Sequence, residues 1–113
     1  MLDIRYYFAP DGKSPFAEWF STLEPVFRAK VATAIARMEQ GNFSNVKPVG
    51  EGVLEYRIDF GPGYRVYFAR HGELLLILLA GGTKRRQQRD IDAAKTSWRD
   101  YKQSRRTRRR EGH

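Results

Sequence analysis

The chain has 113 residues, no cysteine, two histidines and a formal net charge of +8, which is the size of one domain. The lack of cysteine excludes a disulfide framework, a thiolate metal site and a cysteine nucleophile, and we expect neither a metal nor a cofactor. The longest apolar run, residues 74–80, is far shorter than the roughly 20 residues of a membrane span, and the N-terminus lacks a signal-peptide core, so we expect a cytoplasmic protein without membrane contact.

The positive charge is concentrated in the second half of the chain. Residues 1–50 carry six Lys/Arg against five Asp/Glu, whereas residues 51–113 carry fifteen against eight. A one-sided basic surface attracts polyanions and speeds their association. We therefore expect a nucleic acid or an acidic protein segment as a partner.

The N-terminal half predicts one strand and two helices. Residues 2–8 indicate a short strand that ends in the turn-rich "APDGKSP". Ser14 then fits a helix N-cap with Pro15 at the first helical position, and Pro25 starts a second helix that "GN" at 41–42 ends. Apolar residues recur at helical spacing in both, and we interpret them as core: Phe16, Trp19, Phe20 and Leu23 in the first helix and Phe27, Val31, Ala34, Ile35 and Met38 in the second.

The second half predicts a sheet followed by a helix. After a polar connection, three strand-like runs at residues 53–60, 63–70 and 73–80 are joined by "GPG" and "HG", connections so short that neighbouring strands must pair antiparallel. The third run is apolar throughout, as in a strand covered on both faces. Residues 83–102 predict a helix with Ile91, Ala94, Trp98 and Tyr101 on one side.

The element order is therefore βααβββα. It predicts an α+β domain over residues 1–103, with a small antiparallel sheet that carries two N-terminal helices and a C-terminal helix on one face. The Arg-rich residues 104–113 have no apolar anchor, and we expect them to form a disordered basic tail.

Strand alternation in the first hairpin, "RIDFGPGYRVYF", pairs two arginines. Leu54, Tyr56 and Ile58 share a face with Tyr64, Val66 and Phe68 only if Ile58 lies opposite Tyr64. In that register Arg57 faces Arg65 on the other side of the sheet. Like charges placed opposite each other disfavour folding by up to about 1 kcal/mol, so the pair suggests a phosphate-binding role. An exposed face of mixed charges, with Glu55 and Asp59 offsetting the repulsion, is the alternative.

A second unfavourable charge pattern precedes the last helix. Lys84, Arg85 and Arg86 follow Gly81, Gly82 and Thr83 at its N-terminus, where cations are disfavoured by roughly 0.3–1 kcal/mol each and an anion is favoured. The third strand brings this turn to one end of the sheet, beside the hairpin. We therefore expect Arg57, Arg65 and the Lys84 cluster to surround a phosphate.

Residues 54–95, "LEYRIDFGPGYRVYFARHGELLLILLAGGTKRRQQRDIDAAK", resemble the signature region of the RelE/ParE superfamily of toxins from type II toxin-antitoxin systems. The similarity is greatest to the HigB-like, phage Gp49-related branch, also called addiction module killer proteins. It rests on the strand at 54–58, the "GPGYRVYF" hairpin and the "LLxGGxK" motif before a helix containing Asp90 and Ile91. It covers residues 2–102, including Phe16 and Trp19 and the glycines at 50 and 52.

The resemblance implies a RelE-like fold and the cleavage of mRNA on the translating ribosome, restrained by a cognate antitoxin in a hetero-oligomer. By position, Arg65 matches the arginine that contacts the scissile phosphate, Lys84 or Arg85 matches the basic residue after the last strand, and Arg57 matches a basic strand position in the same cleft. Some RelE-type enzymes have a tyrosine in the last helix where this chain has Asp90 and Ile91. A tyrosine-based acid/base mechanism therefore does not transfer.

The residues suggest a metal-independent endoribonuclease, because RNA supplies its own 2′-hydroxyl nucleophile. Arg65 and Arg57 suit stabilisation of the phosphorane. Lys84, whose cationic neighbours favour its neutral form, is a candidate for proton transfer; Asp90 is either a base or a counter-charge on the helix. His71 lies in a tight turn, where we expect an exposed side chain rather than a catalytic one. The candidates for RNA binding are Arg85, Arg86, Arg89, Arg105 and Arg106.

Three functions remain open at this point. The first is a ribosome-dependent mRNA endoribonuclease, or mRNA interferase, that contacts mRNA and ribosomal RNA. The second is a ParE-like inhibitor of DNA gyrase, which needs no phosphate-cleaving constellation. The third is a non-catalytic, phage-derived RNA-binding module. The basic tail fits contact with either ribosomal RNA or the antitoxin.

Overall fold

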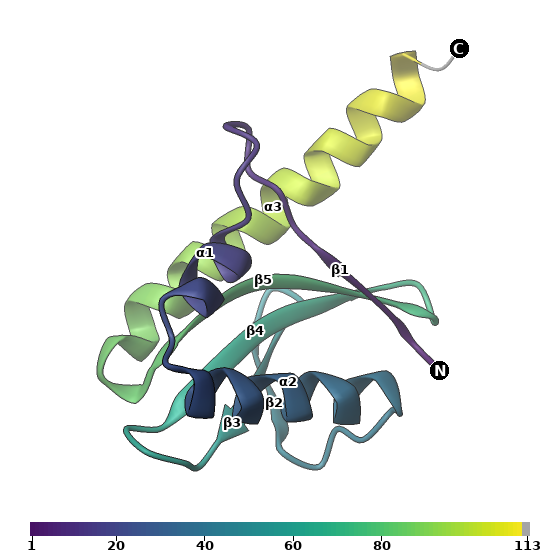
Figure 1. Cartoon of the computed structure of the whole chain (residues 1–113). Helices are drawn as coiled ribbons and strands as arrows, with labels where there is room; N and C mark the ends of the chain where they lie inside the picture. Colours follow the sequence, from purple (N-terminus) through teal and green to yellow (C-terminus); the bar gives the residue numbers. More distant parts are fainter. Residues whose placement is uncertain (112–113) are drawn as a thin grey trace.

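The computed structural model describes residues 1–111, with side chains through residue 106. Figure 1 shows the arrangement of its elements. In chain order they are β1 (Asp3–Tyr6), α1 (Pro15–Ser21), α2 (Pro25–Glu39), β2 (Val46–Gly50), β3 (Val53–Ile58), β4 (Tyr64–His71), β5 (Leu75–Thr83), the 3-10 turn η1 (Lys84–Arg86) and α3 (Gln87–Glu111).

The strands form one sheet in the order β1-β5-β4-β3-β2. Strands β3, β4 and β5 pair antiparallel, which confirms the prediction for the three strand-like runs. Strand β1 differs because it pairs in parallel with β5, through Asp3 opposite Leu75 and Tyr6 opposite Leu78. The sheet is therefore mixed, because two helices and three strands separate β1 from its partner and allow the chain to return in the same direction.

Strand β2 lies where we predicted a polar connection. It pairs antiparallel with β3, and its register shifts between Pro48 and Gly50. Proline and glycine weaken the strand signal in the sequence, yet proline is tolerated in an edge strand, where one side of the backbone needs no ladder hydrogen bond. The α+β class is confirmed, with this strand added to the predicted order.

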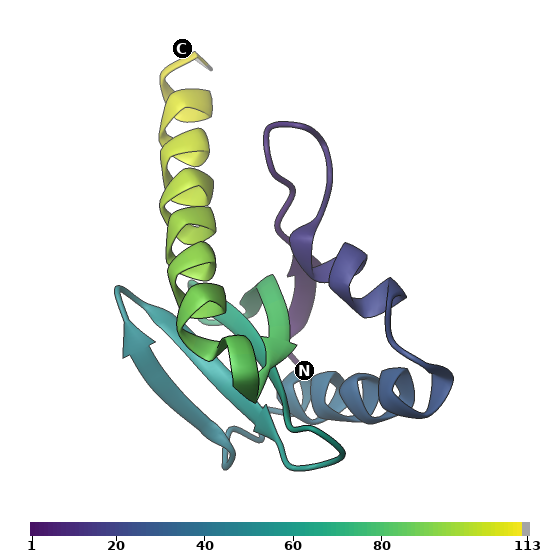
Figure 2. The same cartoon turned by 90° about the vertical axis from the view of Figure 1, so that its left-hand side faces the viewer.

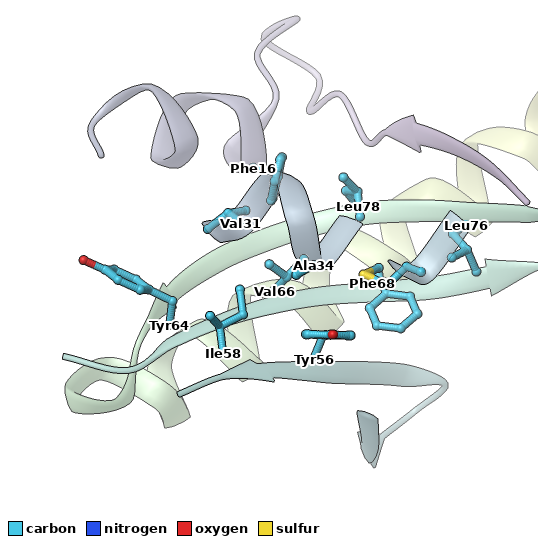
Figure 3. Packing of buried hydrophobic residues seen from close by; sticks show 11 residues of the cluster. Phe16, Val31, Ala34, Tyr56, Ile58, Tyr64, Val66, Phe68, Leu76 and Leu78 are labelled. Carbon is cyan, nitrogen blue, oxygen red and sulfur yellow. The ribbon is translucent and has the colours of Figure 1, made fainter. Parts of the chain in front are cut away.

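Helices cover both faces of the sheet, which corrects the prediction of helices on one face. Figure 2 shows α3 on one side and the α1–α2 pair on the other. On the α1–α2 side, Phe16, Val31 and Ala34 pack against alternate strand residues such as Val66 and Phe68 (Figure 3). On the α3 side, the second core cluster contains Val53, Tyr67, Ala69, Ile77, Leu79, Ile91, Ala94 and Trp98. Strand β5 is buried on both faces, as its continuous apolar sequence predicted.

Helix α3 starts later and ends later than expected. The cations at 84–86 form η1, and α3 begins only at Gln87. It continues through Glu111, so the described backbone at 104–111 is helical where we expected disorder. Arginine, glutamine and lysine are good helix formers, and they extend a helix that packing has already nucleated. Of the expected tail, residues 112–113 and the side chains beyond 106 lie outside the described part.

None of the helices in the described part of the chain is long and apolar enough to cross a membrane. The longest, α3, is 25 residues long and has a very polar composition.

Candidate functional site

The register of the β3–β4 hairpin agrees with the strand-alternation argument. Arg57 pairs with Arg65, and Ile58 pairs with Tyr64. The two arginines therefore lie on the sheet face opposite the α1–α2 core, side by side at one end of the hairpin. Glycines shape the loop between the strands, since Gly61 and Gly63 have φ angles of 59° and 80°, a region that other residues seldom adopt.

The two arginines differ in exposure, because α3 crosses only part of this face. The Arg65 side chain is 7% exposed, and its Nε lies 3.7 Å from Oε1 of Glu55, which is 1% exposed. The Arg57 side chain is 56% exposed, and its Nε lies 3.6 Å from Oδ1 of Asp59. Each arginine thus has a carboxylate neighbour, as in the mixed-charge alternative, but the face at Arg65 is buried rather than open.

Glu55 is the centre of a buried polar cluster that joins three strands to α3. Its Oε2 accepts hydrogen bonds from the Tyr67 hydroxyl at 3.0 Å and from Nε2 of Gln87 at 2.8 Å. Its Oε1 lies 3.7 Å from both Arg65 Nε and Lys47 Nζ without forming a hydrogen bond. Burial, and next the negative charge of Glu55, raise the pKa of Tyr67, which stays a hydrogen-bond donor. The cluster fixes the position of Arg65 relative to the start of α3.

Lys84 and Arg65 meet at the hairpin loop. The Lys84 backbone N–H donates to the Gly63 carbonyl at 3.2 Å. A Cβ placed on Gly63 would lie 3.6 Å from Arg65 Nη1 and 3.8 Å from Lys84 Cβ, so both residues flank this glycine. Arg65 also pairs with Gly82 at the end of β5. The structure thereby brings together the hairpin arginines and the start of the Lys84 cluster.

Asp90 lies above the end of β5, in the first turn of α3. A Cβ on Gly82 would overlap its carboxylate, so the absence of a side chain there makes room for Asp90. Its Oδ2 is buried and has no hydrogen-bond partner among the described residues. Burial raises the pKa of Asp90, while the positive charges of Arg86 and Arg89 act to lower it. The arrangement favours a carboxyl group that holds a proton more readily than an ordinary aspartate.

The remaining cations at the hairpin-loop end of the sheet are exposed. Lys84, Arg85, Arg86 and Arg89 project from η1 and the first turn of α3. The 3-10 turn places the first three ahead of the α3 N-terminus instead of within it, and Asp90 supplies the negative charge that a helix N-terminus favours. Arg57 also lines a cavity of about 300 Å³ together with Lys30 and Arg37 of α2. Cations from β3, η1, α2 and α3 therefore gather around one end of the sheet.

The structure separates two of the candidates from this group. Arg105 and Arg106 lie far along α3, near the β4–β5 turn, where they line a second cavity with His71. His71 is half-buried, and its Nδ1 lies 2.8 Å from the Tyr101 hydroxyl, so the expectation of a solvent-exposed turn residue is wrong. Its ring is held by α3, an element distant in sequence.

Sequence reasoning treated Glu55 only as a surface counter-charge and omitted Lys47, Tyr67 and Gln87. Strand alternation could have predicted part of this cluster. In the predicted register one face of the sheet carries the odd-numbered residues Glu55, Arg57, Arg65 and Tyr67. That α3 would cover this face, and thereby bury the Glu55–Arg65 pair, depended on packing between distant segments. Among the described residues, no three His, Asp or Glu side chains gather as a metal-binding group.

Two comparisons with known proteins bear on this arrangement. A family model described as phage-derived protein Gp49-like (DUF891) matches residues 18–106, which include all the hairpin, η1 and α3 candidates. An uncharacterised protein of Haemophilus influenzae is 44% identical over 81 residues, which are 71% of this chain and 82% of that protein.

Proposed function

The chain belongs to the phage-derived Gp49-like family, which is associated with toxin-antitoxin systems, and from this premise we propose that it is a toxin that cleaves mRNA on the ribosome. The proposal is a HigB-like, metal-independent endoribonuclease that a cognate antitoxin holds inactive. The family suggests the antitoxin partner; mRNA and the ribosome are the further partners that we propose.

One observation carries the proposal: cations from several elements converge on the hairpin loop at residues 61–63. Arg65 Nη1 and Lys84 flank Gly63, and Arg57 is the cross-strand neighbour of Arg65. Exposed Arg85, Arg86 and Arg89 extend the positive surface along η1 and α3. Packing like charges together disfavours folding, whereas it suits an RNA phosphate and the additional charge of its transition state.

The exposed cations are the groups that reach RNA directly. We assign phosphate contact to Arg57 and Lys84, since a guanidinium remains charged and can donate two hydrogen bonds to one phosphate, and an ammonium adds a mobile point charge. Arg65 is 6% exposed, so we assign it a positioning role, held by Glu55 and directed with Nη1 toward the loop. Arg85, Arg86 and Arg89 bind the flanking backbone.

Asp90 is the proposed proton-transfer group. Its carboxyl has a raised pKa because of burial, and a pKa shifted toward neutrality is what an acid/base catalyst requires. Asp90 lies next to Gly82, which pairs with Arg65. In this scheme Asp90 accepts the 2′-hydroxyl proton as that oxygen attacks phosphorus and returns a proton to the 5′-oxygen as its bond to phosphorus breaks, while the cations stabilise the phosphorane. Lys84 is the alternative proton donor to the 5′-oxygen.

The test is mRNA cleavage by the purified protein on programmed ribosomes. Arg57→Ala is expected to reduce cleavage about a hundredfold, the typical effect of losing one transition-state donor, with little change in stability because the side chain is exposed. Arg5→Ala on β1 is the matched control, which removes one exposed charge at the other edge of the sheet. Asp90→Asn tests the proton-transfer assignment through the pH profile of the cleavage rate.

Other outcomes would select the other functions. Intact mRNA together with inhibited supercoiling by DNA gyrase would contradict the proposal and support a ParE-like inhibitor. RNA binding without cleavage on ribosomes would indicate a non-catalytic RNA-binding module. Equal loss of cleavage in Arg57→Ala and Arg5→Ala would show that the hairpin cations have no special role.

The proposed antitoxin covers or distorts the basic end of the sheet. A reading frame for a small acidic or helix-turn-helix protein beside this one would identify the candidate. Binding of the purified antitoxin is expected to displace RNA, because both would use Arg57 and the cations of η1. Simultaneous binding of both with undiminished affinity would contradict this part of the proposal.

A further inference from the structure

A second cationic cavity lies at the opposite end of β4 from Arg65. It has a volume of about 240 Å³ and is formed where the β4–β5 turn meets the middle of α3. Six residues at about 3.3 Å each separate Arg65 from His71 along β4, so the two sites are about 20 Å apart. The cavity is lined by Arg70, His71, Tyr101, Lys102, Arg105 and Arg106, with Gly72 and Trp98 beneath them.

Aromatic rings and cations alternate in this cavity. Trp98 and Tyr101 are stacked, with ring centroids 5.4 Å apart and planes at 12°. Lys102 Nζ lies 5.4 Å from the centroid of the Trp98 ring, and the Arg105 guanidinium carbon lies 5.7 Å from that of Tyr101. Contact with His71 Nδ1 at 2.8 Å holds the Tyr101 hydroxyl in place. The cations are thus arranged over a rigid aromatic base.

Among the described residues, no carboxylate forms an ion pair with the cavity cations. No ion pair among the described residues includes Arg70, Lys102, Arg105 or Arg106. The nearby carboxylates have other partners, since Asp100 accepts a hydrogen bond from Tyr7 and Glu51 binds Arg99. The Arg70 side chain donates to the Glu73 carbonyl and its guanidinium carbon lies 5.6 Å from the centroid of the Phe43 ring, which belongs to the α1–α2 face of the sheet. The cations of Lys102, Arg105 and Arg106 therefore line this hollow without an ion-pair partner among the described residues.

The surface continues on the other side of Tyr101 and Arg105. These two residues also line a neighbouring cavity of about 220 Å³ with Tyr6, Tyr7, Phe8 and Ser104. Tyr6 is 43% exposed and Phe8 is 60% exposed. Both rings are accessible next to the Arg105 side chain.

We propose that this aromatic–basic surface, made of the two cavities on either side of Tyr101 and Arg105, binds single-stranded RNA outside the cleavage site. Single-stranded nucleic acid is bound by cations that contact phosphates and by aromatic rings on which bases stack. An amphipathic protein helix would instead need aliphatic side chains to pack against, and neither cavity is lined by one. The chemistry therefore favours RNA over an acidic protein segment.

The inference deepens the proposed function and depends on it only for the source of the RNA. An RNA strand that runs along α3 would contact Lys102 and Arg105 at one end and the cations near residues 61–63 at the other. Such a second contact would hold the RNA while the hairpin site acts on one phosphate.

The test measures binding of a fluorescein-labelled 2′-O-methyl decauridylate, which cannot be cleaved through its 2′ position, by fluorescence anisotropy without ribosomes. Lys102→Ala/Arg105→Ala is expected to weaken binding about tenfold and to reduce the slope of log K against log salt by about 1.4, since each phosphate contact on a single strand contributes about 0.7. Arg28→Ala/Arg99→Ala removes the same two charges from α2 and another side of α3 and is expected to change binding less than about twofold. Phe8→Leu is expected to weaken binding about fivefold through lost stacking.

Equal weakening by the two double variants would overturn the inference, because it would show attraction by net charge alone. Displacement of the decauridylate by an equimolar decaglutamate peptide would also overturn it and indicate an acidic protein segment as the occupant. Urea denaturation of each variant confirms that the fold is retained. If ribosomal cleavage fails while decauridylate binding still depends on Lys102 and Arg105, the cleavage proposal falls and this one stands.

Discussion

The pairing of Glu55 with Arg65 has consequences for stability that differ from those of the pair formed by Arg57 and Asp59. The first pair is buried and lacks a direct hydrogen bond, since Glu55 Oε1 and Arg65 Nε have no hydrogen-bond partner in the described structure. Such a pair adds little net stability, but removal of one partner leaves the other charge buried. The second pair is exposed, where an ion pair contributes less than about 1 kcal/mol.

Arg65→Met is therefore expected to lower the free energy of unfolding by about 3 kcal/mol or more, measured by urea denaturation. Adding Glu55→Gln should restore part of this loss, because the amide carries no charge to leave unpaired. Arg57→Met serves as the control and should change stability by less than about 0.5 kcal/mol. Additive losses in the Glu55→Gln/Arg65→Met variant would mean that the two side chains do not interact energetically.

The carboxyl group of Asp90 predicts a distinct dependence of stability on pH. Its pKa in the folded protein is raised by burial, so between the ordinary and the raised value the folded chain holds a proton that the unfolded chain has released. The free energy of unfolding should fall as pH rises through this window. Asp90→Asn should remove that fall, so its stability relative to the wild type increases with pH. The exposed Asp92→Asn is the control, and an identical pH profile for wild type and Asp90→Asn would refute the assignment.

At the scale of elements, small residues at the end of β5 determine how closely the helices approach the sheet. Gly81 lies beneath Trp19 of α1, and Gly82 lies beneath Asp90 of α3. The helices are on opposite faces, so consecutive residues of one strand make room for both. Gly81 thus allows α1 to pack closely on one face of the sheet, and Gly82 makes room for the candidate catalytic carboxyl of Asp90 on the other.

Gly81→Ala is expected to destabilise the fold by about 1–3 kcal/mol, since a Cβ there would overlap the Trp19 ring. Gly81 does not have a positive φ angle, so the cost is steric rather than conformational. In a Trp19→Leu background, Gly81→Ala should lower the free energy of unfolding by clearly less. Thermal or urea denaturation of the wild type, the two single variants and the double variant gives the coupling free energy between positions 19 and 81. An equal destabilisation by Gly81→Ala in both backgrounds would exclude a clash with Trp19.

At the scale of the whole molecule, α3 connects the two proposed RNA contacts. Its first turn lies over the Glu55–Arg65 cluster, and its middle forms the cavity with Arg70 and His71. Figure 2 shows it extending well past the sheet. Cations of this one helix and of the adjacent strand ends therefore form two basic regions, one at the hairpin and one at the cavity.

We expect RNA cleavage on ribosomes to depend steeply on salt. Raising KCl from about 50 to about 200 mM should reduce kcat/KM at least tenfold, because several phosphate contacts must compete with counterions. The free energy of unfolding should change by no more than about 1 kcal/mol over the same range, since the exposed ion pairs contribute little. A salt-independent kcat/KM would contradict recognition through the basic surface.

Much of the fold and part of the site follow from local sequence patterns. Strand alternation alone predicts that Arg57 pairs with Arg65, because side chains alternate with a period of two and the apolar set must share a face. Helical spacing likewise predicts the buried faces of α2 and α3. Strand β2 is missed because Pro48 and Gly50 are common in loops, and only the available edge of β3 makes them part of a strand.

The sequence by itself determined the α+β class, the hairpin register, the position of the basic segment after β5 and the family resemblance, since each depends on residues close together in the chain. Only the tertiary structure decided that α3 covers the arginine face, which buries Arg65 against Glu55 and leaves Arg57 exposed. It also decided that His71 meets Tyr101 across 30 residues of chain. Burial and such contacts arise from the packing of distant segments, which no local periodicity specifies.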